Sequence, residues 1–144
     1  MEENFNYQDV PKNYVYCLNN ECTHSSDCLR FKVTLHVDKN ISSFRTVNPV
    51  YVAQQKECFY FQSDRLTRFA LGITHLFDEL PHEKAVKIRN ILYKYFKLNM
   101  FYRIQNKQRL IKPEEQDYIR QVFANEGILE EPVFDEYVDR YNWH

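Results

Sequence analysis

The sequence predicts a single α+β domain in which an N-terminal lobe held by a four-cysteine metal site packs on a mainly helical C-terminal part with one small hairpin. Three observations favour this class. All four cysteines lie in the first 58 residues, the second half repeats apolar residues with a helical period, and the first half carries shorter, strand-like patterns. A length of 144 residues with 11 tyrosines and 11 phenylalanines suits one domain with a sizeable core.

The cysteines form a frame of three close residues and one distant residue: Cys17, Cys22, Cys28 and Cys58. Thiolates on one metal ion lie only about 4 Å apart, because each metal–sulfur bond is about 2.3 Å long. A helix would place the second cysteine about 140° round from the first, so the chain must turn back between them. The intervening Asn19-Asn20 and Ser25-Ser26-Asp27 favour such turns. We therefore expect all four cysteines to bind one metal.

The identity of the metal is not fixed by the ligand type. Sites made only of thiolates suit both zinc and iron–sulfur clusters. The loops of four and five residues differ from the Cys-x-x-Cys-x-x-Cys run of bacterial ferredoxins, whereas zinc accepts a four-residue loop. We therefore expect zinc, with a [4Fe–4S] cluster as the alternative.

Other interpretations of the cysteines stay open. Two disulfides are one, although residues 1–13 lack the basic segment and apolar run of a secretory signal, which favours a cytoplasmic protein with reduced thiols. Cys58 precedes three aromatic residues and can be a buried apolar side chain. A cysteine can also be a nucleophile with His24 as its base, or His24 can replace or donate to one thiolate.

The first half of the chain predicts few regular elements. Residues 1–16 are expected to form an irregular arm. Residues 29–37 fit two structures equally, because their apolar residues alternate as in a strand while Leu29 and Val33 also keep a helical spacing. A short strand is expected over residues 44–48. Residues 1–62 would make up the cysteine-bearing lobe.

The remaining residues, 63–144, would make up the helical part. Apolar residues with a helical spacing, punctuated by proline and glycine, predict four helices: one from Ser63 to Pro81, one from Pro81, one from Pro113 to Gly127, and one from Pro132. Between the second and third helices, residues 100–111 are predicted to form a hairpin with a basic tip.

The net charge of −1 conceals two blocks of opposite sign. Residues 81–112 carry nine basic side chains and one acidic one, whereas residues 113–144 carry two basic and nine acidic. A basic helix and hairpin tip favour a nucleic-acid interface made by Lys87, Lys94, Lys97, Arg103, Lys107 and Arg109. An acidic protein surface is the next partner, and the two blocks can instead neutralise each other.

Several classes of protein are excluded or unsupported. Gly72 and Gly127 are the only glycines, so the chain has no glycine-rich phosphate loop and no dinucleotide fingerprint. No apolar run approaches the roughly 18 residues of a membrane span. No Ser-His-Asp set, nucleophile elbow or pair of catalytic carboxylates can be placed, so an enzymatic function has no positive support.

A set of short motifs is distributed over nearly the whole chain: Val10-Pro11, Cys28-Leu29-Arg30, Asn48-Pro49, Cys58-Phe59-Tyr60, Tyr102-Arg103, Pro113-Glu114-Glu115-Gln116 and Phe134-Asp135-Glu136-Tyr137-Val138 before Trp143. Together with the Cys-x4-Cys-x5-Cys spacing, they resemble a domain of unknown function from Bacteroides-type anaerobic bacteria. The resemblance implies an anaerobic bacterial cytosol and no activity. We therefore expect a non-catalytic, metal-stabilised binding module, with an iron–sulfur redox or sensor protein as the alternative.

Overall fold

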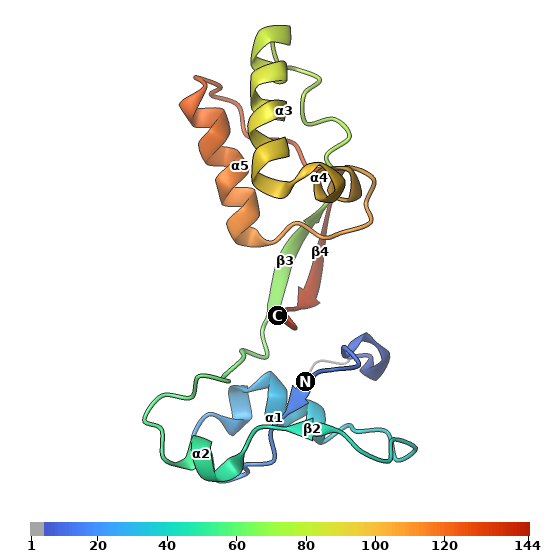
Figure 1. The fold of residues 1–144 in the computed structure, drawn as a ribbon, viewed down its shortest axis with the longest axis vertical. Coiled ribbons are helices and arrows are strands. Elements are labelled where there is room, and N and C mark those ends of the chain that lie inside the picture. Colours follow the sequence, from blue (N-terminus) through green and yellow to red (C-terminus); the bar gives the residue numbers. More distant parts are fainter. Residues whose placement is uncertain (1–4) are drawn as a thin grey trace. The chain divides into compact units, whose positions relative to one another are not determined.

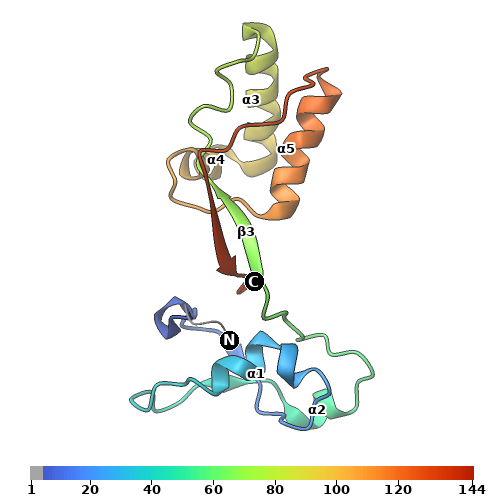
Figure 2. The ribbon, with the colours of Figure 1, turned by 180° about the vertical axis from the view of Figure 1, so that it is seen from behind.

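The computed structural model describes residues 5–144 and confirms the α+β class, with five α-helices and two small two-stranded sheets in that part of the chain (Figures 1 and 2). The helices are α1 (Leu29–Thr34), α2 (Pro49–Ala53), α3 (His82–Phe96), α4 (Leu98–Gln105) and α5 (Pro113–Asn125). The strands are β1 (Val15–Tyr16), β2 (Arg45–Thr46), β3 (Leu66–Leu71) and β4 (Glu136–Tyr141). None of the described helices has the length and apolar character needed to cross a bilayer.

The chain divides into two compact units. The first contains Met1–Leu66 together with Tyr141–His144, and the second contains Thr67–Arg140. The first unit contains the residues of the expected cysteine-bearing lobe, 1–62, together with residues 63–66 and the C-terminal tail. That the two units form one domain stays a prediction.

In the first unit, the ambiguous segment after the cysteines is helical. Leu29 and Val33 lie one helical turn apart in α1 and are both fully buried. Leu35, which a strand would bury beside them, is 67% exposed. The helical spacing therefore decides the structure here. The short strand predicted over 44–48 is confirmed as β2, which pairs in parallel with β1.

The core of the first unit is largely aromatic and is completed by the C-terminal tail. Tyr14 packs edge-on against Trp143 with ring centroids 5.2 Å apart, and Trp143 also packs on Tyr141. Gln62 links the same elements, because its side chain accepts a hydrogen bond from the Tyr14 hydroxyl and donates to the Asn142 carbonyl at 2.7 Å. The tail is thus bound to the unit by both apolar packing and hydrogen bonds.

In the second unit, α3 and α5 lie side by side with α4 near one end of α3 (Figures 1 and 2). Fully buried aliphatic residues from each element meet between them, including Ile88, Ile104 and Ile119. The helices predicted from Pro81 and Pro113 are confirmed. The helix from Pro113, α5, ends at Asn125 and is followed by a Schellman motif, in which Gly127 N–H donates to the Ala124 carbonyl and the Ile128 N–H to the Phe123 carbonyl.

Two predicted helices are strands. The segment from Ser63 forms β3, and the segment after Pro132 forms β4, which runs beside β3 in the opposite direction (Figure 1). Their apolar residues keep a helical spacing, but the backbone gains partners in the strand pair. Ala70 also exchanges two backbone hydrogen bonds with Ile111, at 3.0 and 2.8 Å. Gly72, with φ +86°, then ends β3 where a helix would have continued.

The hairpin predicted over residues 100–111 is also wrong, because its first half, residues 100–105, belongs to α4. Phe101 and Ile104 lie three residues apart and are buried together against α3, which a helix achieves and a strand does not. A left-handed residue, Lys107 with φ +61°, follows α4. Of the second predicted strand, Ile111 alone pairs, with Ala70 of β3.

Replacing Gly72 tests how the second unit holds β3 against the start of β4. An added Cβ would lie 2.5 Å from the Asp135 carboxylate, and the positive φ already disfavours a side chain. We expect Gly72→Ala to lower the free energy of unfolding in urea by about 2–4 kcal/mol. Gly127→Ala is the matched control, because φ is +78° but no atom lies within 4 Å. It should cost only about 1–2 kcal/mol, and equal losses would contradict the steric explanation.

Candidate metal centre and basic surface

All four cysteines line one small pocket in the first unit: Cys17, Cys22, Cys28 and Cys58. The pocket has a volume of about 20 Å³. His24 and Arg30 also line it, along with aromatic side chains that include Phe61. All four cysteines are free thiols. The structure therefore brings together the predicted ligands, although Cys58 lies 30 residues beyond Cys28 in the sequence.

Local backbone contacts position each thiol. Cys17 directly follows β1, and its N–H donates to the Arg30 carbonyl at 3.2 Å. Cys28 is the N-cap of α1 and forms an isolated antiparallel bridge with Ser63. That bridge brings the chain back beside Cys28 shortly after it has passed Cys58. The loop from 17 to 28 is thus closed against the segment that carries the fourth thiol.

A backbone hydrogen bond to sulfur turns the chain at Cys22. The N–H of His24 donates to the Cys22 sulfur at 3.4 Å, two residues along the chain. The His24 ring packs instead against Phe61, with centroids 5.5 Å apart. His24 therefore donates a hydrogen bond through its backbone N–H, and its side chain lines the pocket.

The Cys17 thiol has its pKa raised above the ordinary value for cysteine. Burial is the largest cause, and an N–H bond from Asn19 partly opposes it. The other three cysteines raise it further, because a second negative charge near the first is unfavourable. Cys17 thus lies within electrostatic reach of each of the other three thiols. A cation among them would reverse the effect by stabilising every thiolate.

Arg30 lines the cysteine pocket and joins the segments around it, a role that the sequence analysis missed. Its guanidinium lies over the Tyr14 ring at 4.8 Å and near the Tyr60 ring at 5.9 Å. It also donates to the carbonyls of Val15 and Tyr60, each at 2.8 Å. Arg30 therefore fastens β1 to the segment that follows Cys58. The only sequence signal was its position two residues after a cysteine.

The cysteines share a pocket but do not yet form a coordination site. Within residues 5–144, no three His, Cys, Asp or Glu side chains already stand in an arrangement that could hold a metal ion. A bound ion would therefore have to draw the four sulfur atoms closer together than they stand. Binding of a metal by these residues stays a prediction.

The six basic residues of the candidate nucleic-acid interface fall into two groups. Three of them pair with carboxylates of the acidic block: Lys87 with Glu126 at 3.1 Å, Lys107 with Glu136 at 2.9 Å, and Arg109 with Glu115 at 3.0 Å. Arg109 is only partly exposed, and Glu115 is buried. The basic and acidic blocks therefore neutralise each other at several points within the second unit.

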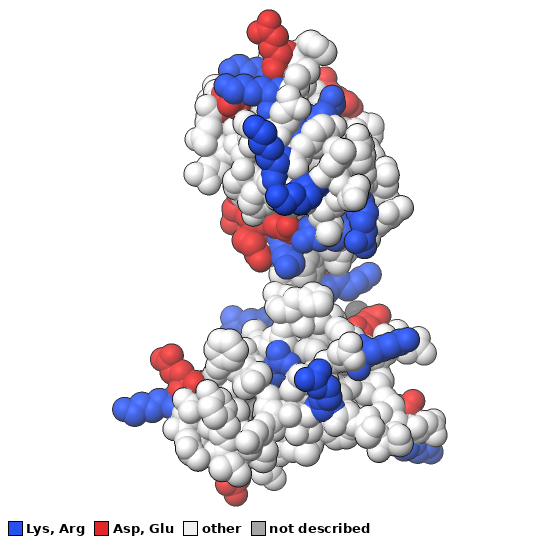
Figure 3. Space-filling view, viewed as in Figure 1, with Lys and Arg blue, Asp and Glu red and all other residues white. Residues whose placement is uncertain are grey.

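The other three basic residues are exposed and have no ion pair with any described carboxylate: Lys94, Lys97 and Arg103. Lys94 lies in the last turn of α3, Lys97 lies between the helices with φ +68°, and Arg103 lies in the last turn of α4. Figure 3 shows basic side chains running down over α3 toward α4, with acidic ones on the α5 side. The residual positive charge thus follows the α3–α4 junction.

Titration of Glu126 tests whether the two blocks interact in solution. The hydrogen bond from Lys87 lowers the pKa of the Glu126 carboxyl, and Lys84 adds to this at 3.6 Å. The contribution of Glu126 to stability is therefore present above its unfolded pKa of about 4.3 and is lost as the pH falls through the lower folded value. Side-chain NMR should show the lowered midpoint. Lys87→Ala should raise it, whereas Lys94→Ala should not, and equal effects would contradict a specific pair.

Comparison with known proteins gives one match. The model described as "Family of unknown function (DUF6078)" matches residues 1–143. No curated protein and no solved structure shows significant similarity to the chain. The match confirms the resemblance to a domain of unknown function, whereas the bacterial source and the cysteine frame expected with it stay predictions. The chain therefore belongs to the DUF6078 family of unknown function.

Proposed function

We propose that this protein is a non-catalytic binding module whose first unit is held together by one zinc ion bound to the four cysteines. The observation that carries the proposal is that Cys17, Cys22, Cys28 and Cys58, all the cysteines of the chain, line a single pocket. Four thiols at one point are the ligand set of a closed, structural zinc site.

The spacing of the cysteines favours zinc over a cluster. The loops of four and five residues between Cys17, Cys22 and Cys28 differ from the Cys-x-x-Cys-x-x-Cys run of bacterial ferredoxins, and zinc accepts a four-residue loop. Zinc is the preferred metal for that reason, and the iron–sulfur redox or sensor function remains the alternative.

The packing around the pocket gives the ion a structural role. None of the residues from 17 to 27 is buried, and none from 53 to 63 is buried. Apolar burial therefore cannot hold these two segments together. The backbone hydrogen bonds that join the chain here lie at the segment ends, from Leu29 to Gln62 and from Asp64 to Asp27, and Arg30 joins Tyr60 to β1. Metal binding would supply the missing free energy, because ligation of a structural zinc is worth on the order of 10 kcal/mol and is released only on folding.

Elemental analysis of the full chain, purified under reducing conditions, tests this proposal. We expect one zinc per chain. Cys22→Ser should lose the metal and increase hydrogen exchange of the backbone in residues 15–62. His24→Ala is the matched control, since it removes a ring from the same pocket but leaves all four thiols and the backbone N–H. It should keep the metal.

Three results would contradict the proposal. A wild-type chain that folds without any metal would show that the cysteines do not form a structural metal site. A brown protein that contains about four irons would replace zinc with a cluster. Loss of zinc in His24→Ala with retention in Cys22→Ser would make the histidine a ligand in place of that thiolate.

A second candidate function, binding of single-stranded nucleic acid, is favoured by the residues around the α3–α4 junction. The three unpaired cations there, Lys94, Lys97 and Arg103, are interspersed with exposed aromatic rings. Tyr95 is 45% exposed and Tyr102 is 46% exposed. Interfaces for single-stranded nucleic acid usually combine cations, which neutralise phosphates, with aromatic rings on which bases stack.

Two triple variants separate this surface from the ion pairs. We expect Lys94→Ala, Lys97→Ala and Arg103→Ala together to abolish binding of a single-stranded oligonucleotide, measured by fluorescence anisotropy at low salt. Alanine at Lys87, Lys107 and Arg109 should weaken it much less, because carboxylates already neutralise those side chains. With three phosphates neutralised, the slope of log affinity against log salt should be about −2. Equal losses in both variants, or no binding by the wild type, would exclude this interface.

A further inference from the structure

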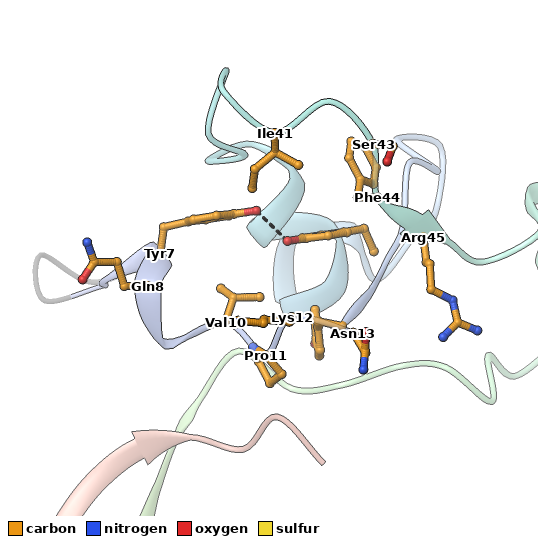
Figure 4. Close-up of a pocket in the computed structure, with 12 residues that line it drawn as sticks. Tyr7, Gln8, Val10, Pro11, Lys12, Asn13, Ile41, Ser43, Phe44 and Arg45 are labelled. Carbon is orange, nitrogen blue, oxygen red and sulfur yellow. Dashed lines mark hydrogen bonds between the residues drawn. The ribbon is translucent and has the colours of Figure 1, made fainter.

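A second, larger pocket lies in the first unit between the N-terminal arm and the strand pair β1–β2. Its volume is about 610 Å³, within the range of about 300–1,000 Å³ of small-molecule sites. The 3-10 helix at Tyr7–Asp9 supplies one side, and the segment from Ile41 to Arg45 supplies the other (Figure 4). None of its lining residues is among the cysteines or the basic residues discussed above.

The charges at this pocket have one sign. Lys12 and Arg45 line it, both are exposed, and neither forms an ion pair with a described carboxylate. No aspartate or glutamate is among the described residues that line it. Among the described residues that line the pocket, a ligand with negative charge would therefore meet two cations and no carboxylate.

A pair of tyrosine hydroxyls offers a further donor. The oxygens of Tyr7 and Tyr16 lie 2.6 Å apart, and Figure 4 marks this bond where the Tyr7 ring reaches across the pocket between Ile41 and Val10. One hydroxyl donates to the other, so the pair uses one of its two protons and keeps one to donate elsewhere. Burial raises the pKa of Tyr16, and the bond from Tyr7 raises it further, so this phenol stays protonated. An anionic oxygen is the acceptor that such a donor would stabilise best.

Apolar rings supply the remaining surface. Phe44 packs edge-on against Tyr16 with centroids 4.9 Å apart, yet it is 40% exposed. Ile41 is also 40% exposed. A flat ring placed against these side chains would remove apolar area from water while its charged group reached the cations.

We propose that this pocket binds a small organic anion built on a flat ring. Aromatic carboxylates and nucleoside monophosphates share that chemistry. The site is separate from the proposed zinc ion and from the α3–α4 surface, so the outcome for one does not decide the others.

NMR titration of the full, 15N-labelled chain tests the proposal. The probes are adenosine monophosphate and 4-hydroxybenzoate. Two half-ligands serve as controls: adenosine has the flat ring without the negative charge, and inorganic phosphate has the charge without the ring. We expect at least one of the two complete ligands to shift the amide signals of residues 7–16 and 41–45, and to bind more tightly than either half-ligand. Which one binds identifies the source of the anion.

Variants then assign the binding to the pocket. Arg45→Ala or Lys12→Ala should weaken the affinity about five-fold, as expected for one exposed charged contact worth about 1 kcal/mol. Lys39→Ala, an exposed cation of the same unit outside the pocket, should have no effect. The variant with alanine at Lys94, Lys97 and Arg103 should also bind normally. The proposal is overturned if neither complete ligand binds, or if Lys39→Ala weakens binding as much as Arg45→Ala.

Discussion

The first unit depends on the meeting of two chain segments that bury no side chain of their own. Residues 17–27 and 53–63 contribute nothing to the core, yet all four thiols of the chain lie where these segments approach each other. Arg30 fastens β1 to the second of these segments, through the carbonyls of Val15 and Tyr60 and the rings of Tyr14 and Tyr60. In a unit whose core is a cluster of aromatic rings on a short helix, a cross-link at this point would limit the freedom of the whole cysteine region. A metal ion provides such a cross-link in a reducing environment, where disulfides do not persist.

The second unit is held together differently, by a continuous aliphatic core with charge neutralisation at its surface. Carboxylates from the acidic block pair with Lys87, Lys107 and Arg109, so the large opposing charges of the sequence largely cancel inside one folded body. What remains is a smaller positive surface at the α3–α4 junction. Any partner of this surface would respond to about three charges rather than the eight that the sequence suggests.

Sequence patterns predicted most of the features that depend on neighbours along the chain, although α4 was predicted as part of a hairpin. Pro113 at the start of α5 and Gly127 after its end were correctly placed, because caps act within one turn. The strands β3 and β4 were predicted as helices, because their pairing joins residues about 70 positions apart and leaves no local signal. The four cysteines were found by their spacing, whereas Arg30 was missed because its partners lie 15 and 30 residues away. The pocket between the N-terminal arm and residues 41–45 was missed for the same reason.

The most direct measurement of the central claim is X-ray absorption at the zinc edge on the full chain, purified without added chelator. The account predicts four sulfur atoms at about 2.3 Å from one zinc and no lighter atom in the first shell. A first shell with two or more nitrogen or oxygen atoms would contradict the four-cysteine site, and so would a folded protein that contains no zinc.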